Sequence, residues 1–478
     1  MYSNNQCSIK IGNKQTESFT QGRGVRQGCP LSPTLFNIYI NELAKLLEQS
    51  AAPGLTLHDS SIKFLLYADD LVLLSPTEEG LQQNLDILHQ FCQTWALTIN
   101  MAKTKVLTFQ KRPRCQGKKH NFTLGMTKID HATNYTYLGL KFNTNGNFSL
   151  AVNELKEKAR RAFYAIKKSI QFEIPIRIWL KIFQSVIEPI ALYGSEVWGP
   201  LLNHEFDKWD KNPIETLHAE FCKSILRVQR NTPNNACRAE LGQYPLLIHI
   251  EKRAIKFWKH LKMSDPNSYH FKALKNHEVN AEKSPLIQLI LRLQKQTNTS
   301  NNNQPQDTDT LIHTIWPNQM IKAQKENYLT YWTETTQKQS KLECYLALNR
   351  NYTTAEYLSA VKDSELRRRM TRYRLSNHTL AVETGRYRQN WLPRESRICP
   401  YCTAGEVETE THFLTRCPNY EQIKNTFYPK FEILCPDFIK SNNKTQLLHV
   451  LGEQRDCILL AARYINACHK KREESTNQ

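Results

Sequence analysis

Residues 62–74 read IKFLLYADDLVLL, and this stretch decides the fold of the N-terminal region. Two short apolar runs flank Asp69 and Asp70, a pattern typical of a β-hairpin with both acids at its tip. Strand interiors disfavour aspartate, and two neighbouring like charges are costly to bury without a cation. A divalent ion would relieve that cost, and a solvent-exposed Asp-Asp turn is the alternative. The pattern predicts the hairpin and leaves both interpretations of the acids open.

Helices are predicted on both sides of this hairpin. Upstream, Ser32 is a suitable N-cap and Pro33 suits the first helical position. Downstream, Ser75 and Glu78 have the spacing of a capping box. Apolar residues recur at helical spacing in both segments: Phe36, Tyr39 or Ile40, Leu43 and Leu47 in the first, and Leu81, Leu85, Leu88, Cys92 and Trp95 in the second. Residues 98–140 return to short runs typical of strands, so the N-terminal region mixes helices and strands.

Composition indicates the class of partner. The 478 residues suggest about three domains. The excess of 64 Lys and Arg over 45 Asp and Glu leaves a net charge of +19, which favours nucleic acid over an anionic membrane surface. No apolar run is long enough for a transmembrane helix, and the N-terminus does not resemble a signal peptide. With 13 cysteines and no secretory signal, the sequence indicates a protein that is not secreted and that lies in a reducing compartment.

The rest of the chain is predicted to be helical and basic. Residues 146–294 form one helical region, and the polar stretch 295–310 is nearly free of apolar residues, which is typical of a linker. Residues 311–478 are again mainly helical. The expected fold class is therefore α+β, with a mixed region over 1–145, the helical region, the linker and a helical C-terminal region.

A cysteine and histidine cluster occupies residues 399–417. Its members are Cys399, Cys402, His412 and Cys417, which form the pattern C-x2-C-x9-H-x4-C. Three thiolates and one imidazole suit tetrahedral Zn²⁺ and leave no position for water, so the spacing predicts a structural zinc site. Chance clustering of buried cysteines is the alternative. The segment from Glu406 to Leu414 is expected to form a short helix that delivers His412.

Four sequence blocks carry a resemblance to a known family. They are residues 21–33 (QGRGVRQGCPLSP), 67–70 (YADD), 95–105 (WALTINMAKTK) and 137–140 (YLGL). In this order they resemble the blocks of reverse transcriptases of non-LTR (LINE-type) retrotransposons, and the zinc spacing is similar to the C-terminal element of the same family. The resemblance implies a partial palm over 1–145, a helical thumb or connection over 146–294 and a zinc-bearing C-terminal region.

The resemblance also implies roles for individual residues. Asp69 and Asp70 would hold catalytic Mg²⁺, and Lys103 would lie near the leaving pyrophosphate, where a cation can assist. Gln27 would contact the sugar of the incoming nucleotide, and Gly28 and Ala68 would leave room for it. The implied reaction is RNA-directed DNA synthesis, with an RNA template and a DNA target or primer as partners.

The family pattern is incomplete in this chain. The family uses a further aspartate on an earlier apolar strand, but only 26 residues precede Gln27 and the first aspartate is Asp59. We therefore expect an N-terminally truncated polymerase with no activity of its own. The alternative is a non-enzymatic RNA- or DNA-binding remnant. Either protein would belong to a nuclear or cytoplasmic ribonucleoprotein, and its oligomeric state is left open.

Several basic runs are candidates for phosphate contacts, although a basic run is often only a solvated face. Those assigned to nucleic-acid binding are Arg160, Arg161, Lys167, Lys168, Arg367, Arg368 and Arg369. A further basic loop contains Lys111, Arg112, Arg114, Lys118 and Lys119. Trp391 and Tyr401 could stack on unpaired bases or lie in the core, and the core is the prediction for Trp391.

Overall fold

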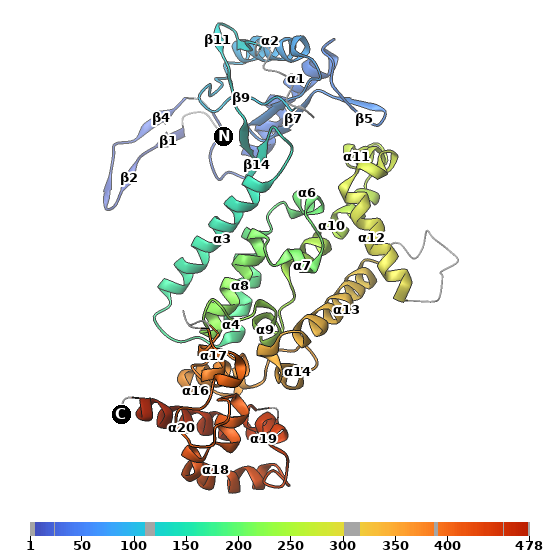
Figure 1. The fold of residues 1–478 in the computed structure, drawn as a ribbon. Helices are drawn as coiled ribbons and strands as arrows, with labels where there is room; N and C mark the ends of the chain where they lie inside the picture. The colour runs from blue at the N-terminus through green and yellow to red at the C-terminus, as the bar shows by residue number, and fades with distance from the viewer. Residues whose placement is uncertain are drawn as a thin grey trace. The chain divides into compact units, whose positions relative to one another are not determined.

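The chain was analysed as a computed structural model, in which residues 5–22, 24–109, 120–300, 316–386, 391–452 and 454–476 are described. It divides into two compact units (Figure 1). Unit 1 comprises Met1–Asn147 and His260–Ala281, and unit 2 comprises Phe148–Lys259 and Glu282–Gln478. The predicted basic loop at Lys111–Lys119 lies outside the described residues. The α+β prediction is confirmed at the level of a mixed N-terminal region followed by a largely helical one.

Unit 1 contains the described strands, and each pairs with one neighbour. The ribbons are β1–β4, β2–β3, β5–β6, β7–β8, β10–β11 and β13–β14, all antiparallel, and the parallel pair β9–β12. The strands are β1 (Asn5–Cys7), β2 (Lys10–Ile11), β3 (Lys14–Gln15), β4 (Phe19–Gln21), β5 (Leu55–Leu57), β6 (Ser60–Ile62), β7 (Phe64–Tyr67), β8 (Asp70–Leu73), β9 (Lys105–Val106), β10 (Thr123–Leu124), β11 (Thr127–Lys128), β12 (Asp130–His131), β13 (Asn134–Tyr137) and β14 (Leu140–Asn143). The described strands thus form two-stranded ribbons and no wider sheet.

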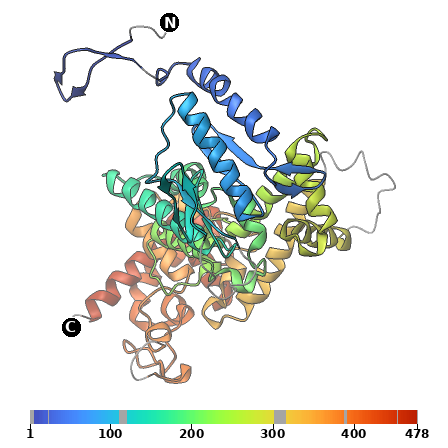
Figure 2. The ribbon, with the colours of Figure 1, turned by 90° about the horizontal axis from the view of Figure 1, so that it is seen from above.

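The core of unit 1 lies where helices α1 (Ser32–Gln49) and α2 (Glu78–Thr94) pack side by side (Figures 1 and 2). The apolar stripes predicted for both helices meet there, because Leu43 and Leu47 of α1 and Leu85 and Leu88 of α2 are buried together. Leu71 and Leu73 of β8 pack against the same cluster. Local apolar spacing therefore predicted this core, and the core holds the Asp69–Asp70 hairpin in place.

Both predicted helix starts need correction. Thr77, and not Ser75, caps α2 by accepting a hydrogen bond from the Gly80 N–H at 3.1 Å. Ser32 is the first residue of α1 rather than its N-cap, and its hydroxyl donates to the Arg26 carbonyl at 2.5 Å. Because that hydroxyl already has a partner in the preceding loop, it does not cap the helix.

A distant segment completes unit 1. Helix α11 (Tyr269–Val279) packs on the β5–β6 ribbon, where Lys272 Nζ lies 3.2 Å from Asp59 Oδ1 and donates to Ser60 Oγ at 2.7 Å. The hydrogen bond with Lys272 lowers the pKa of Asp59. Sequence order assigned this segment to the helical region 146–294, whereas its contacts assign it to the mixed N-terminal unit.

The remaining helices belong mainly to unit 2. They are α3 (Ser149–Ser169), α4 (Ile176–Ile182), α5 (Glu188–Ala191), α6 (Ser195–Trp198), α7 (Phe206–Trp209), α8 (Pro213–Leu226), α9 (Asn234–Glu240), α10 (Leu246–Lys262), α12 (Pro285–Ser300), α13 (Trp316–Gln337), α14 (Tyr345–Leu348), α15 (Tyr357–Ala360), α16 (Ser364–Arg374), α17 (Ala381–Thr384), α18 (Glu421–Leu434), α19 (Asn443–Val450) and α20 (Ile458–Thr476). The π-helical segments are η1 (Phe183–Ile187) and η7 (His412–Arg416), and the 3-10 segments are η2 (Gly199–Leu201), η3 (Ala281–Lys283), η5 (Ser340–Leu342), η6 (Arg394–Ser396), η8 (Pro418–Tyr420) and η9 (Arg455–Cys457).

The structure differs from the predicted division of the helical regions in two ways. Helix α12 continues to Ser300, so the first residues of the predicted 295–310 linker are helical. The predicted thumb and C-terminal regions also share one unit. A buried ion pair joins them, because Arg374 Nε of α16 lies 2.7 Å from Glu240 Oε1 of α9.

Two further observations concern unit 2 and the helices as a set. Cys435, after α18, and Cys457 of η9 are disulfide-bonded, a pairing that the expectation of a reducing compartment did not include. In the part of the chain that is described, none of the helices combines the length and apolar character needed to cross a membrane.

Candidate functional site

The Asp69–Asp70 hairpin has the predicted form. Tyr67 pairs with Asp70 across β7 and β8, so Ala68 and Asp69 make the two-residue turn. Ala68 has φ +52°, in the left-handed region that costs an L-residue on the order of 1 kcal/mol. Both aspartates are exposed, and neither forms an ion pair with a described residue. Their oxygens are therefore open to a cation or to water.

A second hairpin lies close to this turn. Burial raises the pKa of Tyr137, and the charge of Asp70 raises it further, which places the two side chains within electrostatic range. Leu138 and Gly139 both have positive φ, +47° and +79°, as the tight turn between β13 and β14 requires. The structure thus brings the YADD and YLGL blocks together.

The other predicted polymerase residues lie on the surface of unit 1. Gln27 is exposed in the loop before α1, and Gly28 has φ +81° with open space where a Cβ would be. Lys103 is exposed in a turn, where its N–H donates to the Asn100 carbonyl at 3.1 Å. An exposed lysine and an open glycine are compatible with substrate contacts and equally with a plain surface.

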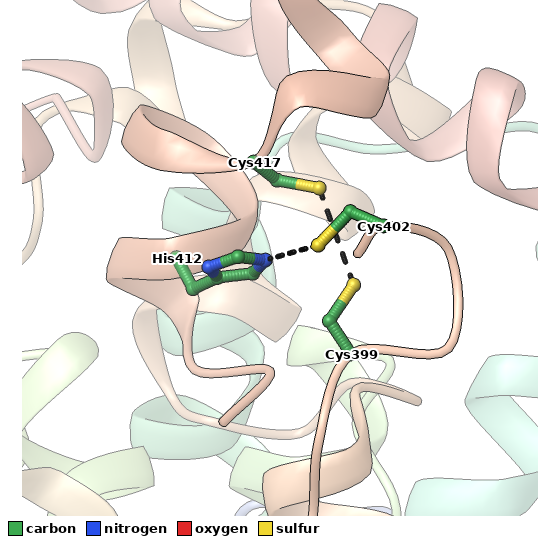
Figure 3. A group of neighbouring side chains, drawn as sticks. All are labelled: Cys399, Cys402, His412 and Cys417. Atoms are coloured by element: carbon green, nitrogen blue, oxygen red, sulfur yellow. Dashed lines mark hydrogen bonds between the residues drawn. The ribbon is translucent and has the colours of Figure 1, made fainter. Parts of the chain in front are cut away.

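The four predicted zinc ligands converge in unit 2 (Figure 3). Their ligand atoms all lie within 4.8 Å of one another; Cys399 Sγ is 4.0 Å from Cys417 Sγ, and Cys402 Sγ is 3.4 Å from His412 Nε2. Tetrahedral ligands about 2.3 Å from one zinc ion lie roughly 3.8 Å apart. The cluster therefore has the size that a zinc ion requires, and it can hold one.

Backbone structure explains this convergence. A β-bridge pairs Ile398 with Val407, and the Cys399 N–H donates to the Glu406 carbonyl at 2.9 Å. The prediction of a helix from Glu406 is therefore wrong for residues 406–409, which are not helical. His412 is instead the first residue of the π-helical segment η7. At its end, the Cys417 N–H donates to the His412 carbonyl at 2.7 Å, which sets both ligands on one turn.

The sequence interpretation missed Glu406 as part of this site. His412 Nδ1 lies 2.8 Å from Glu406 Oε2, and Arg416 lies 3.3 Å from the same oxygen. The hydrogen bond with His412 lowers the pKa of Glu406, so the residue accepts as a carboxylate. An accepting carboxylate fixes the proton on Nδ1 and directs Nε2 to the cluster, the usual arrangement for a metal-bound histidine. A carboxylate a few residues before the histidine was the available signal.

The protein groups of the cluster compete for protons. The Cys417 thiol raises the pKa of Cys399 to about 12, and Cys399 raises the pKa of His412 to about 9. In the absence of a metal, the thiols and the imidazole therefore hold protons, and a bound cation would displace them.

We expect Glu406→Gln to weaken zinc binding by about tenfold, because an amide orients the imidazole less strongly than a carboxylate does. Competition with a chromophoric chelator measures this affinity. Glu421→Gln is the matched control, since that carboxylate is 60% exposed and pairs with Lys424. Equal zinc affinity in both variants would contradict the assigned role.

The predicted phosphate-contact residues on α3 fall into two groups. Arg160 Nε lies 3.3 Å from Glu220 Oε1, and Lys167 Nζ donates to Ser224 Oγ at 2.6 Å, so both are tied to α8. Arg161 and Lys168 are exposed and form no ion pair within the described ranges. The second group is the one free to meet phosphate.

The arginines of α16 have protein partners. Arg367 pairs with Glu173, and Arg368 and Arg369 lie 2.7 and 3.0 Å from Glu365. The side chains of Arg367 and Arg369 are only 13% and 11% exposed. The structure therefore gives this run a packing role that its sequence did not indicate.

The two aromatic candidates near the cluster differ in burial. Trp391 is 65% exposed, so its prediction as a core residue is wrong; it precedes the 3-10 segment η6 in an extended stretch. Tyr401 is half-buried, and the Arg472 guanidinium lies over its ring at 4.9 Å. Both rings are thus at least partly accessible.

Comparison with known proteins agrees with the blocks of unit 1. Residues 2–142 match the family model "Reverse transcriptase (RNA-dependent DNA polymerase)". The chain is 30% identical over 165 residues to a type-1 retrotransposable element R2 Pol polyprotein of Nasonia vitripennis, over 32% of this chain and 15% of that protein. It is 26% identical over 187 residues to the RNA-directed DNA polymerase from mobile element jockey of Drosophila melanogaster, over 37% and 19%. An R2 Pol polyprotein of Popillia japonica is 30% identical over 261 residues, 53% of this chain and 35% of that protein. The chain therefore spans about a third or less of these relatives.

Proposed function

Because residues 2–142 form a reverse transcriptase domain with non-LTR retrotransposon homologues, we propose that this chain is part of the RNA-directed DNA polymerase of such an element. We further propose that the chain alone binds RNA and DNA without extending a primer. Under this second proposal, the isolated chain is a nucleic-acid-binding protein rather than an enzyme.

One observation carries the second statement. Within the described ranges, Asp69 and Asp70 do not belong to any group of three or more potential metal ligands, whereas the Cys3His cluster does. Two Mg²⁺ ions that clamp a phosphoryl transfer need shared carboxylate ligands in addition to substrate phosphates. Two adjacent aspartates on one exposed turn supply too few oxygens for both ions.

The proposed roles of the polymerase residues come from the family resemblance, and the exposure of these residues is compatible with them. Asp69 and Asp70 fit Mg²⁺ in part, since both carboxylates are exposed and without an ion-pair partner among the described residues. Ala68 and Gly28 keep the turn and the loop before α1 free of bulk beside a nucleotide. Gln27 would donate to its sugar, and Lys103 would place a positive charge near the departing pyrophosphate.

Nucleic-acid contacts outside unit 1 are proposed for two surfaces. On α3, the exposed side chains of Arg161 and Lys168 can reach phosphate, whereas Arg160 and Lys167 are bonded to Glu220 and Ser224 of α8. On α16, Arg368 is the most exposed of the three arginines, at 35%. Zinc bound to Cys399, Cys402, His412 and Cys417 would stabilise the fold of the C-terminal region. A nuclear or cytoplasmic ribonucleoprotein is the proposed setting.

Primer extension tests the proposal. We expect the purified chain, given an RNA template, a DNA primer, Mg²⁺ and nucleotides, to yield no product above background, and Asp69→Asn to leave that result unchanged. A complete reverse transcriptase under the same conditions is the positive control. A gel shift of the same primer–template measures binding, which should weaken steeply with salt as phosphate contacts do. Extension that Asp69→Asn abolishes would overturn the proposal.

A further inference from the structure

A cavity of about 690 Å³ lies beside the Cys3His cluster, within unit 2. Its walls come from α16, α17, α20 and the cysteine knuckle, and the residues that matter here are Arg372, Tyr401, Glu408, His469 and Arg472. The volume is within the range of sites that take one small ligand. Below, we call it the Arg372 cavity.

The wall of the Arg372 cavity carries an arginine whose charge is not matched. Arg372 is half-buried, its Nε–H has no hydrogen-bond partner, and it forms no ion pair with a described residue. Burial lowers its pKa, and the neighbouring Arg368 and Arg369 lower it further, partly opposed by Glu365. Even a half-buried arginine beside like charges is stabilised when an anion joins it.

Another part of the wall carries an ion pair between Arg472 and Glu408. Arg472 donates to both oxygens of Glu408, each at 3.0 Å, and Glu408 also accepts from the Ala381 N–H at 2.6 Å. The Arg472 guanidinium lies over the Tyr401 ring, 4.9 Å from its centroid, and so holds that ring in position. A fixed aromatic ring on a cavity wall is a stacking surface for a base.

His469 lines the Arg372 cavity, and its pKa reflects the electrostatic potential there. Tyr373 Oη lies 2.9 Å from His469 Nδ1, so a hydroxyl donating there leaves the proton on Nε2, which lies 3.4 Å from Glu473 Oε1. Burial lowers the pKa of His469 to about 4, and Arg369, Arg372 and Arg472 all act in the same direction, partly opposed by Glu473. The arginines thus make the potential at His469 more positive, while Glu408 and Glu473, which also line the cavity, balance part of that charge.

We propose that the Arg372 cavity binds one unpaired nucleotide of a single-stranded nucleic acid, with Arg372 on its phosphate and the Tyr401 ring against its base. A base inside a duplex cannot reach such a ring, which excludes double-stranded partners. RNA and single-stranded DNA share the chemistry, and the experiment separates them. This inference rests on the proposed nucleic-acid binding and adds the site.

The test uses the full zinc-loaded chain and oligonucleotides of about 12 nucleotides carrying one photoreactive iodouracil, as RNA, as single-stranded DNA and as a duplex. We expect the single strands to crosslink to the peptide that contains Tyr401, and the duplex not to. Arg372→Ala should reduce this crosslink about tenfold, the effect of losing one charge-assisted contact. Arg372→Gln keeps the bulk of the side chain and should do the same, so a folding defect in one variant does not decide the result.

Arg455→Ala is the matched control, because Arg455 is 84% exposed, reaches Glu356 only at 3.9 Å and does not line the cavity. It removes the same charge and should leave the crosslink within about twofold of the unchanged chain. Crosslinks elsewhere with none at Tyr401, or an equal loss in the Arg372 and Arg455 variants, would overturn the cavity assignment. If neither RNA nor DNA bound the chain at all, the proposed function itself would fail.

Discussion

Replacing Cys417 by serine should reduce the zinc content of the purified chain from about one ion to near zero and unfold the surrounding region at lower temperature. Cys417 is fully buried, and its Sγ lies 4.0 Å from that of Cys399. A serine hydroxyl is a poor zinc ligand, so three ligands would remain. Structural zinc contributes about 10–16 kcal/mol of apparent binding free energy in isolated zinc fingers, which makes this the largest expected effect.

The consequence should spread through an aromatic stack. Phe413 of η7 packs on Tyr420 at 4.8 Å and on Tyr373 of α16 at 5.3 Å between ring centroids. Loosening η7 would therefore disturb α16 as well. Metal analysis by mass spectrometry and thermal unfolding followed by circular dichroism measure the two effects.

Cys344→Ser is the control for this substitution, since Cys344 lies in unit 2 outside the cluster and is half-buried. It should retain zinc. A Cys417→Ser protein with a full complement of zinc would contradict a four-ligand site, and so would a chelator that removes zinc without changing the unfolding temperature.

Replacing Glu215 by alanine should lower the free energy of unfolding by about 3–5 kcal/mol, because the buried Arg238 would lose its buried partner and keep only Asp210, which is 41% exposed. Glu215 has no exposed surface. It accepts hydrogen bonds from Trp209 Nε1 at 2.6 Å, the Leu246 N–H at 2.8 Å and Arg238 Nη1 at 2.9 Å, and His218 Nδ1 lies at 3.1 Å. One carboxylate thereby joins α7, α8, α9 and α10.

The same group predicts a pH dependence. Burial would raise the pKa of Glu215, but Arg238 and His218 outweigh it and hold the pKa at about 2, below the ordinary 4.5. A carboxyl group whose pKa is lower in the folded than in the unfolded state stabilises the folded protein. The full stabilisation is present at pH values above the pKa of the unfolded state. Its contribution, on the order of 3 kcal/mol, should be lost as the pH falls from about 4.5 towards 2.

Urea unfolding at several pH values tests both statements. In Glu215→Gln, the free energy of unfolding should change less with pH in this window. This variant also serves as the test if the alanine variant does not fold. Glu220→Gln on the same helix is the control; that side chain is 28% exposed, and its loss should cost less than about 1 kcal/mol. If Glu215→Gln lost the same free energy of unfolding at low pH as the unchanged chain, this role of Glu215 would be ruled out.

Local patterns predicted a large share of what was found in unit 1. The apolar runs around Asp69 predicted the β7–β8 hairpin, and the stripes through Leu43 and Leu85 predicted the helices that support it. Helix starts were predicted less well, because residue type alone does not decide which side chain forms the capping bond: Ser32 bonds to the Arg26 carbonyl in the preceding loop, and Thr77 rather than Ser75 accepts from the Gly80 N–H.

The Cys3His cluster was predicted because its ligands lie close in sequence, so spacing alone limits their geometry. Glu406 was missed, although it is only six residues from His412, because Glu408 and Glu410 also precede the histidine and sequence alone does not say which carboxylate contacts it. The roles of Gln27, Gly28, Ala68, Asp69, Asp70 and Lys103 remain predictions, since exposure and turn geometry permit them without requiring them.

By itself, the sequence determined the hairpin, its supporting helices, the reverse transcriptase blocks and the zinc ligand set, since each depends on residues near one another along the chain. Only the tertiary structure decided that α11 joins the N-terminal unit, that Arg367 and Arg369 are used in packing, and that Arg372 lines a cavity with Tyr401. The physical reason is that a charged side chain looks the same in sequence whether it meets water, a carboxylate or a ligand. Its partner can come from a segment more than two hundred residues away, as Lys272 and Ser60 show with a separation of 212 residues.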